Sequence, residues 1–551
     1  MTAGYLGDTY AVLHRPDGEP TGAAVLFVAP FGWDDVGSYR SRRAWAESLR
    51  AAGHPVLRFD LPGTGDSLGG PFDDDLVQRW VSAVGDAATF LRDATGMDRV
   101  AVVAVGLGGL LTLAAANDGA PIDEAVLWGT PPSGRHVVRE LKAFSKMAAA
   151  RAGGPNDAFA VPEGAVVANG FLLAPQTAED VAALGIPGRV LERALLLGRD
   201  GVAPDPVLKD VADECETGPG DGYGAFVTEP QFSVPPYDVM AQVATWLSPS
   251  TQVAEPRAYL AESAGNERVL DVDGLAGVLT EPDGPVRATV VLLNAGAIRR
   301  IGPNRMWVEG ARRWAANGVR TLRVDLSHIG DSAGNDVWRG DNGQFYEGAY
   351  RDEVSALLDR LGGRSVLLAG LCSGAYWSFH AGQDDPRVRS VVLLNPLTLA
   401  YDPFWETIRE SRVLSRAWQG HGWKRLLRGH TSLANVLSVL RAVLVRIVTA
   451  PTRLPAKLSA RREARRAGGD RIDLGFARLR ENGVRTTVVF TTAEPLREEF
   501  ARTGRLDRLR ALPNVDLRLL DTPPDVHTLQ PPGVQAMVSA ILDAEVAAVS
   551  E

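Results

Sequence analysis

Cysteine is scarce in this chain. The 551 residues include 2 cysteines, Cys215 and Cys372. Two thiols are too few for a disulfide framework and indicate a reducing compartment. The start of the chain lacks the basic and apolar regions of a signal peptide, and no apolar run is judged long enough to span a membrane. These absences predict a cytoplasmic protein without a membrane span.

An excess of positive charge is also missing. The formal net charge is −9 and the isoelectric point is about 5.6, which argues against a surface built to bind nucleic acid. Hydrophobic residues make up 45% of the chain and charged residues 23%, as in ordinary globular proteins. The length allows two large α/β domains, each with a sizeable core.

The sequence repeats itself once. The segment LRFDLPGTGDS at 57–67 returns as LRVDLSHIGDS at 322–332, so that Asp60 and Asp325 are 265 positions apart. Shorter matches, such as VLHRPDG at 12–18 with VLTEPDG at 278–284, have nearly the same spacing. This period is far too long for a solenoid, and each copy is large enough to form a domain. The repeat therefore predicts two homologous lobes in tandem.

Both halves alternate short apolar runs with amphipathic segments. Residues 24–28 and 289–293 are typical of buried strands, whereas 45–50 and 308–314 are typical of helices. Such alternation predicts an α/β fold in which each lobe has a mostly parallel sheet with helices on both faces. The turn residues SPST at 248–251 mark the predicted boundary, between lobes 1–250 and 251–551.

A thiol lies where a predicted strand turns sharply into a helix. The apolar run VLLA at 366–369 predicts the strand, and Gly370 and Gly374 flank Cys372 in the pattern G-x-C-x-G. A buried structural cysteine beside a tight turn would produce the same local pattern. The pattern resembles the nucleophile elbow of the α/β-hydrolases, with cysteine in the position of serine.

A second motif resembles the same family. Segments 57–67 and 322–332 are similar to the D-x-x-G-x-G-x-S loop that follows an early strand in many α/β-hydrolases, although His328 and Ile329 depart from its first glycine. The resemblance covers most of both lobes, but only the second lobe has the specific motifs. It implies an α/β-hydrolase fold for each lobe and Cys372 as a nucleophile, as in dienelactone hydrolases and some thioesterases.

The remaining catalytic groups follow from the order of residues in that family, which is nucleophile, acid and then histidine. Glu494 follows the predicted strand 486–490, and His527 follows the last predicted strand. The resemblance implies that Glu494 orients the ring of His527, which takes the proton of the Cys372 thiol. Glu498 and Glu499 are alternative acids on the following helix.

The family also implies two backbone donors that stabilise the oxyanion formed during acyl transfer. One is the N–H of Ser373, directly after the nucleophile. The other is expected in the loop at 294–297 (NAGA), where Ala297 N–H is favoured and Gly296 N–H is the alternative.

The first lobe lacks an equivalent nucleophile. With an offset near 264, Gly108 lies opposite Cys372. The pair Gly106 and Gly108 also suggests a dinucleotide-binding motif, but Leu111 replaces the third glycine of G-x-G-x-x-G. Asp200 can occupy the acid position.

A base is missing from the first lobe as well, because no histidine lies between His136 and His328. The lobe is therefore expected to be inert. Its expected roles are to pack against the second lobe, to form one wall of a cleft or to bind a partner.

A long insertion at about 397–475 occupies the position of a cap in the second lobe. It contains four large aromatic residues, Phe404, Trp405, Trp418 and Trp423, and a basic run at 457–466 (KLSARREARR). A helical cap would shape an acyl pocket and exclude water. The basic run is typical of a solvated helix face, although it could also meet an acidic carrier protein.

These observations favour acyl transfer through a thioester on Cys372. The acyl group would come from an ester or thioester, on a small molecule or a carrier protein, and pass to water, an alcohol or an amine. No cofactor or metal is expected. The alternative is a non-catalytic tandem scaffold that binds a small molecule or a partner protein. The sequence does not predict the acyl group, the acceptor or the oligomeric state.

Overall fold

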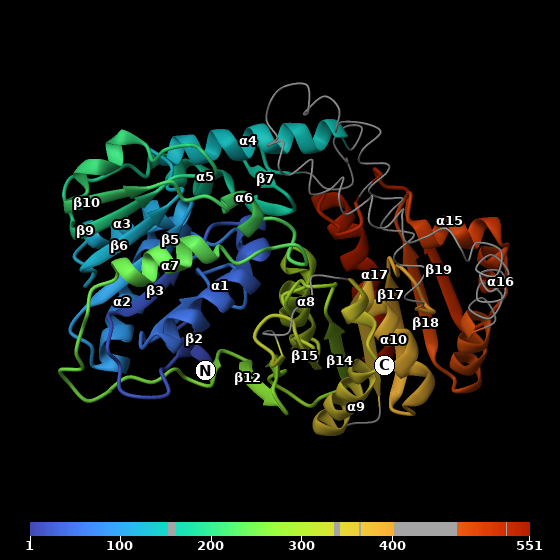
Figure 1. Cartoon of the computed structure of the whole chain (residues 1–551). Coiled ribbons are helices and arrows are strands. Elements are labelled where there is room, and N and C mark those ends of the chain that lie inside the picture. The colour runs from blue at the N-terminus through green and yellow to red at the C-terminus, as the bar shows by residue number, and fades with distance from the viewer. Residues whose placement is uncertain (152–160, 335–341, 363–364, 402–470, 525, 551) are drawn as a thin grey trace, which may run out of the picture.

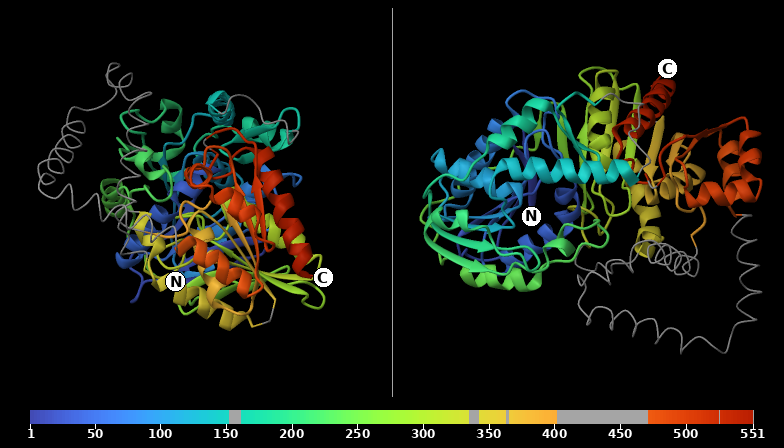
Figure 2. Two further views of the ribbon diagram at one scale, coloured as in Figure 1. Left: turned by 90° about the vertical axis from the view of Figure 1, so that its right-hand side faces the viewer. Right: turned by 90° about the horizontal axis from the view of Figure 1, so that it is seen from above.

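The computed structural model of the chain describes residues 1–151, 161–334, 342–362, 365–401, 471–524 and 526–550. In these residues the strands form two large sheets and one small hairpin. The first sheet and its helices lie beside the second sheet and its helices, as Figure 1 and the views in Figure 2 show. The predicted α/β class is confirmed.

The first sheet has eight strands and is mostly parallel. Only β2 runs against the others, because it is antiparallel to both of its neighbours, β1 and β4. In spatial order the strands are β1 (Thr2–Leu6), β2 (Thr9–His14), β4 (Val56–Phe59), β3 (Ala24–Val28), β5 (Val100–Val105), β6 (Glu124–Trp128), β9 (Leu191–Leu197) and β10 (Ala212–Gly218). One face packs on α1 (Trp33–Ala51), α6 (Tyr223–Phe226) and α7 (Tyr237–Trp246), and the other on α2 (Leu76–Thr95), α3 (Leu107–Asn117), α4 (Gly134–Arg151) and α5 (Pro175–Ala183).

The second sheet repeats this strand order after one extra two-residue strand at its edge. Its strands are β11 (Ser263–Ala264), β12 (Glu267–Val272), β13 (Leu275–Thr280), β15 (Val319–Val324), β14 (Ala288–Leu293), β16 (Val366–Leu371), β17 (Val388–Leu394), β18 (Arg485–Phe490) and β19 (Val515–Leu519). From β15 to β19 all strands are parallel, and β13 is antiparallel to β15. The two sheets therefore share one strand order, and the tandem arrangement of two homologous lobes stays a prediction.

Two layers of helices bury the second sheet. Along β14, Val290 and Leu292 face one core and Val291 and Leu293 face the other, because successive side chains of a strand point to opposite faces. One layer consists of α8 (Met306–Ala315) and α17 (Pro532–Ser550), and the other of α9 (Ala349–Leu361), α10 (Ser373–Asp384), α15 (Pro495–Arg502) and α16 (Arg505–Arg510). This double burial explains why the strand sequences are almost continuously apolar.

Helix α17 differs from the expectation that no segment is long enough for a membrane span. Among the described residues it alone is long and apolar enough to cross a membrane, judged by length and composition only. Its side chains Val534, Val538, Leu542 and Val546 are buried in the core beside α8 and the sheet. Packing against the sheet accounts for this apolar face.

The two lobes meet through a buried ion network built on the repeated D-x-x-G-x-G-x-S loops. Arg58 of the first lobe donates to Asp331 of the second at 2.7 Å, and Arg323 of the second lobe pairs with Asp66 of the first. The two arginines are 265 positions apart in the chain, and so are the two aspartates, which is the spacing of the repeat. The arginine of each lobe thus pairs with the aspartate of the other. Two like subunits related by a twofold axis make paired contacts of this kind.

Arg300 lies at the centre of this network. Its guanidinium is fully buried and pairs with Asp66 at 3.0 Å, with Asp325 at 2.6 Å and with Asp331 at 3.3 Å. Arg299, its neighbour in the chain, pairs with Asp60 at 2.8 Å. Because only Ile298 separates Arg299 from the 294–297 loop, the lobe interface also anchors the loop expected to supply an oxyanion donor.

Candidate active site

Cys372 occupies a sharp turn between β16 and α10. Its backbone has φ 58° and ψ −110°, a conformation that side-chain-bearing residues adopt only under strain. A Cβ added to Gly370 would lie 2.3 Å from the backbone of Gly374, and one added to Gly374 would lie 2.3 Å from the carbonyl oxygen of Asn294. Only glycine fits at either position, which is the steric reason for the G-x-C-x-G pattern.

His527 and Glu494 come together from separate loops. His527 Nδ1 lies 2.9 Å from Glu494 Oε2, in the loops that follow β19 and β18. Glu494 is 4% exposed, and its other oxygen accepts a hydrogen bond from Thr491 Oγ1 at 3.2 Å. A carboxylate held in this way fixes the orientation of the ring and the proton on Nδ1.

The ring of His527 also interacts with Cys372. Burial alone would lower the pKa of His527, but the Cys372 thiol and the Glu494 carboxylate outweigh it and raise the pKa to about 10. Nε2 of the ring is buried and has no hydrogen-bond partner among the described residues. A hydrogen bond that tightens only when substrate binds is common in unliganded sites. The arrangement favours the protonated form of the His527 ring.

Replacing the carboxylate tests this arrangement. In Glu494→Gln we expect the titration of His527 to move down from about pH 10, by about 1 to 3 pH units, because a negative charge that favours the protonated ring is lost. The ¹⁵N shifts of labelled histidine measure this titration without any substrate. Glu498→Gln is the matched control, since Glu498 is exposed and should leave the titration in place. An unchanged titration in Glu494→Gln would remove Glu494 from the acid position.

Asn395 connects the two loops and was missed by sequence reasoning. It follows β17, is 1% exposed, and donates from Nδ2 to Thr491 Oγ1 at 3.0 Å and to the carbonyl oxygen of His527 at 3.2 Å. Its Oδ1 accepts from the backbone N–H of Thr491 at 2.9 Å. A polar residue directly after the apolar end of a strand, VVLL at 391–394, was the available signal, because the carboxyl ends of parallel strands meet at one edge.

The expected oxyanion donors lie beside the elbow. The N–H of Gly296 donates to Ser373 Oγ at 3.0 Å, so this alternative donor is already engaged. Among the described residues no acceptor is found for the N–H of Ala297. The geometry therefore favours Ala297 over Gly296 as the partner of Ser373 N–H.

The first lobe has its elbow two residues from the predicted position. Gly106, between β5 and α3, has φ 56° and ψ −122°, matching the backbone of Cys372. A Cβ on Gly108 would approach the carbonyl oxygen of Val28 at 2.6 Å, just as one on Gly374 would approach that of Asn294. Gly106 is therefore the counterpart of Cys372, and the assignment of Gly108 to that role is wrong because the local offset is 266 and not 264. Glycine still stands where the second lobe has its thiol.

A tyrosine closes off this glycine elbow. The hydroxyl of Tyr223 lies 3.1 Å from the Cβ position of Gly106, and Tyr223 is 6% exposed. Asp200, expected as an acid, accepts hydrogen bonds from the backbone N–H groups of Gly222 at 2.6 Å and Gly224 at 2.7 Å. Its carboxylate thus holds the turn that places Tyr223.

The remaining expectations have mixed outcomes. Glu498 and Glu499 are exposed on α15, whereas Glu494 is buried against His527. Most of the expected cap at 397–475, with its four aromatic residues and the basic run at 457–466, lies outside the described residues. Within the described part of the chain, no group of three or more histidine, cysteine or acidic side chains could hold a metal ion.

The two thiols should differ in reactivity. Burial raises the pKa of Cys215, whereas Cys372 lies beside the His527 imidazole. We expect iodoacetamide to modify Cys372 first near neutral pH, because the thiolate is the reactive form. Peptide mass mapping over time measures both rates, and His527→Ala should slow only the modification of Cys372. Faster modification of Cys215 would contradict the assignment.

No protein-family model matches the sequence, and no curated protein matches it either. Solved structures with a similar fold include Est1E from Butyrivibrio proteoclasticus with bound ferulic acid (17% identity, 45% of this chain and 97% of that chain, TM-score 0.34). A second is a thioesterase domain from the curacin biosynthetic pathway (16% identity, 51% of this chain and 100% of that chain, TM-score 0.30). A third is dienelactone hydrolase from Anabaena variabilis (15% identity, 50% of this chain and 95% of that chain, TM-score 0.30). The strand order, the antiparallel second strand and the elbow at Cys372 show that the chain has the α/β-hydrolase fold.

Proposed function

We propose that the chain catalyses acyl transfer through a thioester on Cys372, either by hydrolysing an ester or thioester or by passing the acyl group to an alcohol or amine. The observation that carries this proposal is the position of His527, which hydrogen-bonds Glu494 at 2.9 Å while its pKa responds to the Cys372 thiol. A thiolate held beside an imidazolium at a strained elbow is an activated nucleophile.

The reaction would proceed in two steps. The Cys372 thiolate attacks the acyl carbonyl, the N–H groups of Ser373 and Ala297 stabilise the oxyanion, and the leaving group departs with the proton of the His527 imidazolium. The acceptor then gives its proton to His527 and attacks the thioester, and the sulfur of Cys372 departs as a thiolate, which restores the thiolate–imidazolium pair. Glu494 keeps the ring in place throughout.

In this proposal the first lobe takes no part in the chemistry, because Gly106 provides no nucleophile and Tyr223 fills the adjacent space. We also propose a lobe boundary near residue 250, a cap over the Cys372 site and an acyl donor on a carrier protein. A cytoplasmic location is proposed as well, because it would keep the Cys372 thiol reduced.

Intact-mass analysis tests the proposal. A panel of acyl thioesters and esters should add one acyl mass to the wild-type chain, and Cys372→Ser should bind the acyl group more slowly because the histidine environment suits a thiol. Decay of the acyl-enzyme is then followed with and without added alcohols and amines. Faster decay with an acceptor indicates a transferase, and decay to free acid at one rate indicates a hydrolase. No adduct from any donor would favour the non-catalytic scaffold.

A further inference from the structure

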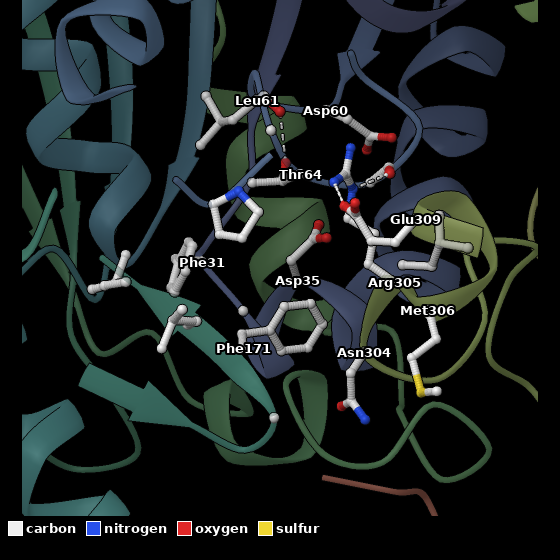
Figure 3. Close-up of a pocket in the computed structure, with 18 of the residues that line it drawn as sticks. Phe31, Asp35, Asp60, Leu61, Thr64, Phe171, Asn304, Arg305, Met306 and Glu309 are labelled. Carbon is white, nitrogen blue, oxygen red and sulfur yellow. Dashed lines mark hydrogen bonds and ion pairs between the residues drawn. The ribbon is translucent and has the colours of Figure 1, made fainter. Parts of the chain in front are cut away.

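A pocket of about 370 Å³ lies between the two lobes, and neither Cys372, His527 nor Glu494 lines it (Figure 3). From the first lobe it is lined by the loops that follow β3 and β4 and by the hairpin of β7 (Val166–Ala168) and β8 (Phe171–Leu173). From the second lobe it is lined by residues 301–306, α8 and α17. We refer to it as the inter-lobe pocket.

This pocket occupies the edge at which α/β proteins bind ligands, beyond the carboxyl ends of β3 and β4. Pro30 lines it and lies 3.6 Å from the Cβ position of Gly106. The first lobe has therefore lost its nucleophile but keeps a cavity beside the elbow. A lobe with a pocket and no nucleophile is suited to binding and not to bond cleavage.

The walls are mainly apolar, with acidic side chains among them. Phe31, Trp80 and Phe171 provide aromatic surface, and Figure 3 shows Asp35 near Phe31 and Phe171. Asp35 is 8% exposed. Its Oδ1 pairs with Arg42, whereas Arg299 approaches Oδ2 only at 3.9 Å.

The other charged groups of the pocket are already engaged. Both oxygens of Asp60 accept from Arg299, and one also accepts from the N–H of Asp66. Arg305 donates to Glu309 and to the carbonyl oxygens of residues 65, 67 and 69. Asp35 Oδ2 is left as the acceptor with spare capacity, and a buried carboxylate among aromatic rings favours a donor group, whether ammonium or hydroxyl.

The pocket also contacts the loop that carries His527. Asn304, which lines the pocket, donates from Nδ2 to the carbonyl oxygens of Thr528 and Leu529, both at 3.0 Å. Gln535, on the pocket side of α17, donates from Nε2 to the carbonyl oxygens of Gly170 at 3.0 Å and Gln530 at 2.9 Å. Two pocket side chains thus hold the three residues that directly follow His527.

We propose that the inter-lobe pocket binds a small molecule with an aromatic or aliphatic body and an ammonium or hydroxyl head, that Asp35 accepts the hydrogen bond of this head, and that binding alters the reactivity of Cys372 through the 528–530 loop. The binding part is independent of the proposed function. The coupling part rests on it, because it assumes that His527 activates Cys372.

Saturation-transfer NMR on the full chain tests binding, with phenethylamine, 2-phenylethanol and phenylacetate as probes of matched size. We expect signal from the amine and the alcohol and none from phenylacetate, whose negative head would face Asp35. Ala536→Trp, which fills the pocket from α17, should weaken binding at least tenfold. Ala540→Trp is the matched control, because Ala540 is exposed one turn further along the same helix. Absence of binding by both donor probes, or equal binding to the Ala536→Trp variant, would overturn the site.

Iodoacetamide modification tests the coupling. A saturating concentration of the bound probe should change the rate at Cys372 at least twofold in the wild type and leave it unchanged in Ala536→Trp. A rate that stays constant in the wild type would overturn the coupling. The Cys372→Ala variant should bind the probe as tightly as the wild type, so that failure of the proposed function leaves the binding result readable.

Discussion

Cys372→Ala should abolish acyl-enzyme formation and lower kcat/KM by a factor on the order of 10⁴ to 10⁶, because a nucleophile that acts as a unit with its base cannot be replaced by neighbouring groups. The measurement is turnover of whichever thioester or ester acylates the wild-type chain, together with intact mass. Cys372 is only partly buried, so the fold should persist and the circular dichroism spectrum should match that of the wild type.

Two variants make this result specific. Cys215→Ala should keep wild-type turnover, since Cys215 lies in β10 of the first lobe. Cys372→Ser should be folded and much slower than the wild type, because a hydroxyl is far harder to ionise than a thiol. Full activity of Cys372→Ala would rule out the thioester mechanism, and full activity of Cys372→Ser would show that the thiol has no chemical importance.

Asp331→Ala should destabilise the chain by about 3–5 kcal/mol, because removing one partner leaves buried charges uncompensated. The Asp331 side chain is 0% exposed and pairs with Arg58 and Arg300. It also accepts a hydrogen bond from the hydroxyl of Tyr39 at 2.6 Å. Urea unfolding followed by tryptophan fluorescence measures the free energy of unfolding. Asp507→Ala is the control, since Asp507 is 83% exposed beside Arg510, and such a pair contributes at most about 1 kcal/mol.

The pH dependence of stability gives a second measure of the same contact. Burial alone would raise the pKa of Asp331, but Arg58 and Arg300 hold it well below its ordinary value. A carboxyl with a lowered pKa in the folded state adds stability above its unfolded pKa of about 4, and this stability is lost as the pH falls below that value. The wild type should therefore lose more stability between about pH 5 and pH 2 than Asp331→Asn does. Equal losses would contradict the assignment.

Local sequence patterns determined much of this protein. The apolar runs of the strands, the glycines around Cys372 and the repeat of 57–67 at 322–332 predict two α/β units and one elbow with a thiol. These features are readable because strand burial and the steric limits of a tight turn depend on residues adjacent in the chain. The resemblance to the α/β-hydrolases, with their order of nucleophile, acid and histidine, also singled out Glu494 and His527, which the fold brings to within 2.9 Å.

Only the tertiary structure decided which groups meet across the molecule. A two-residue error in aligning the lobes assigned the elbow to Gly108, and backbone angles were needed to identify Gly106. The bridging role of Asn395, the exchange of Arg58 with Asp331 and of Arg323 with Asp66, and the pocket around Asp35 all join residues far apart in the sequence. Such contacts depend on how sheets, loops and lobes pack together, and no periodicity within a single segment records that packing.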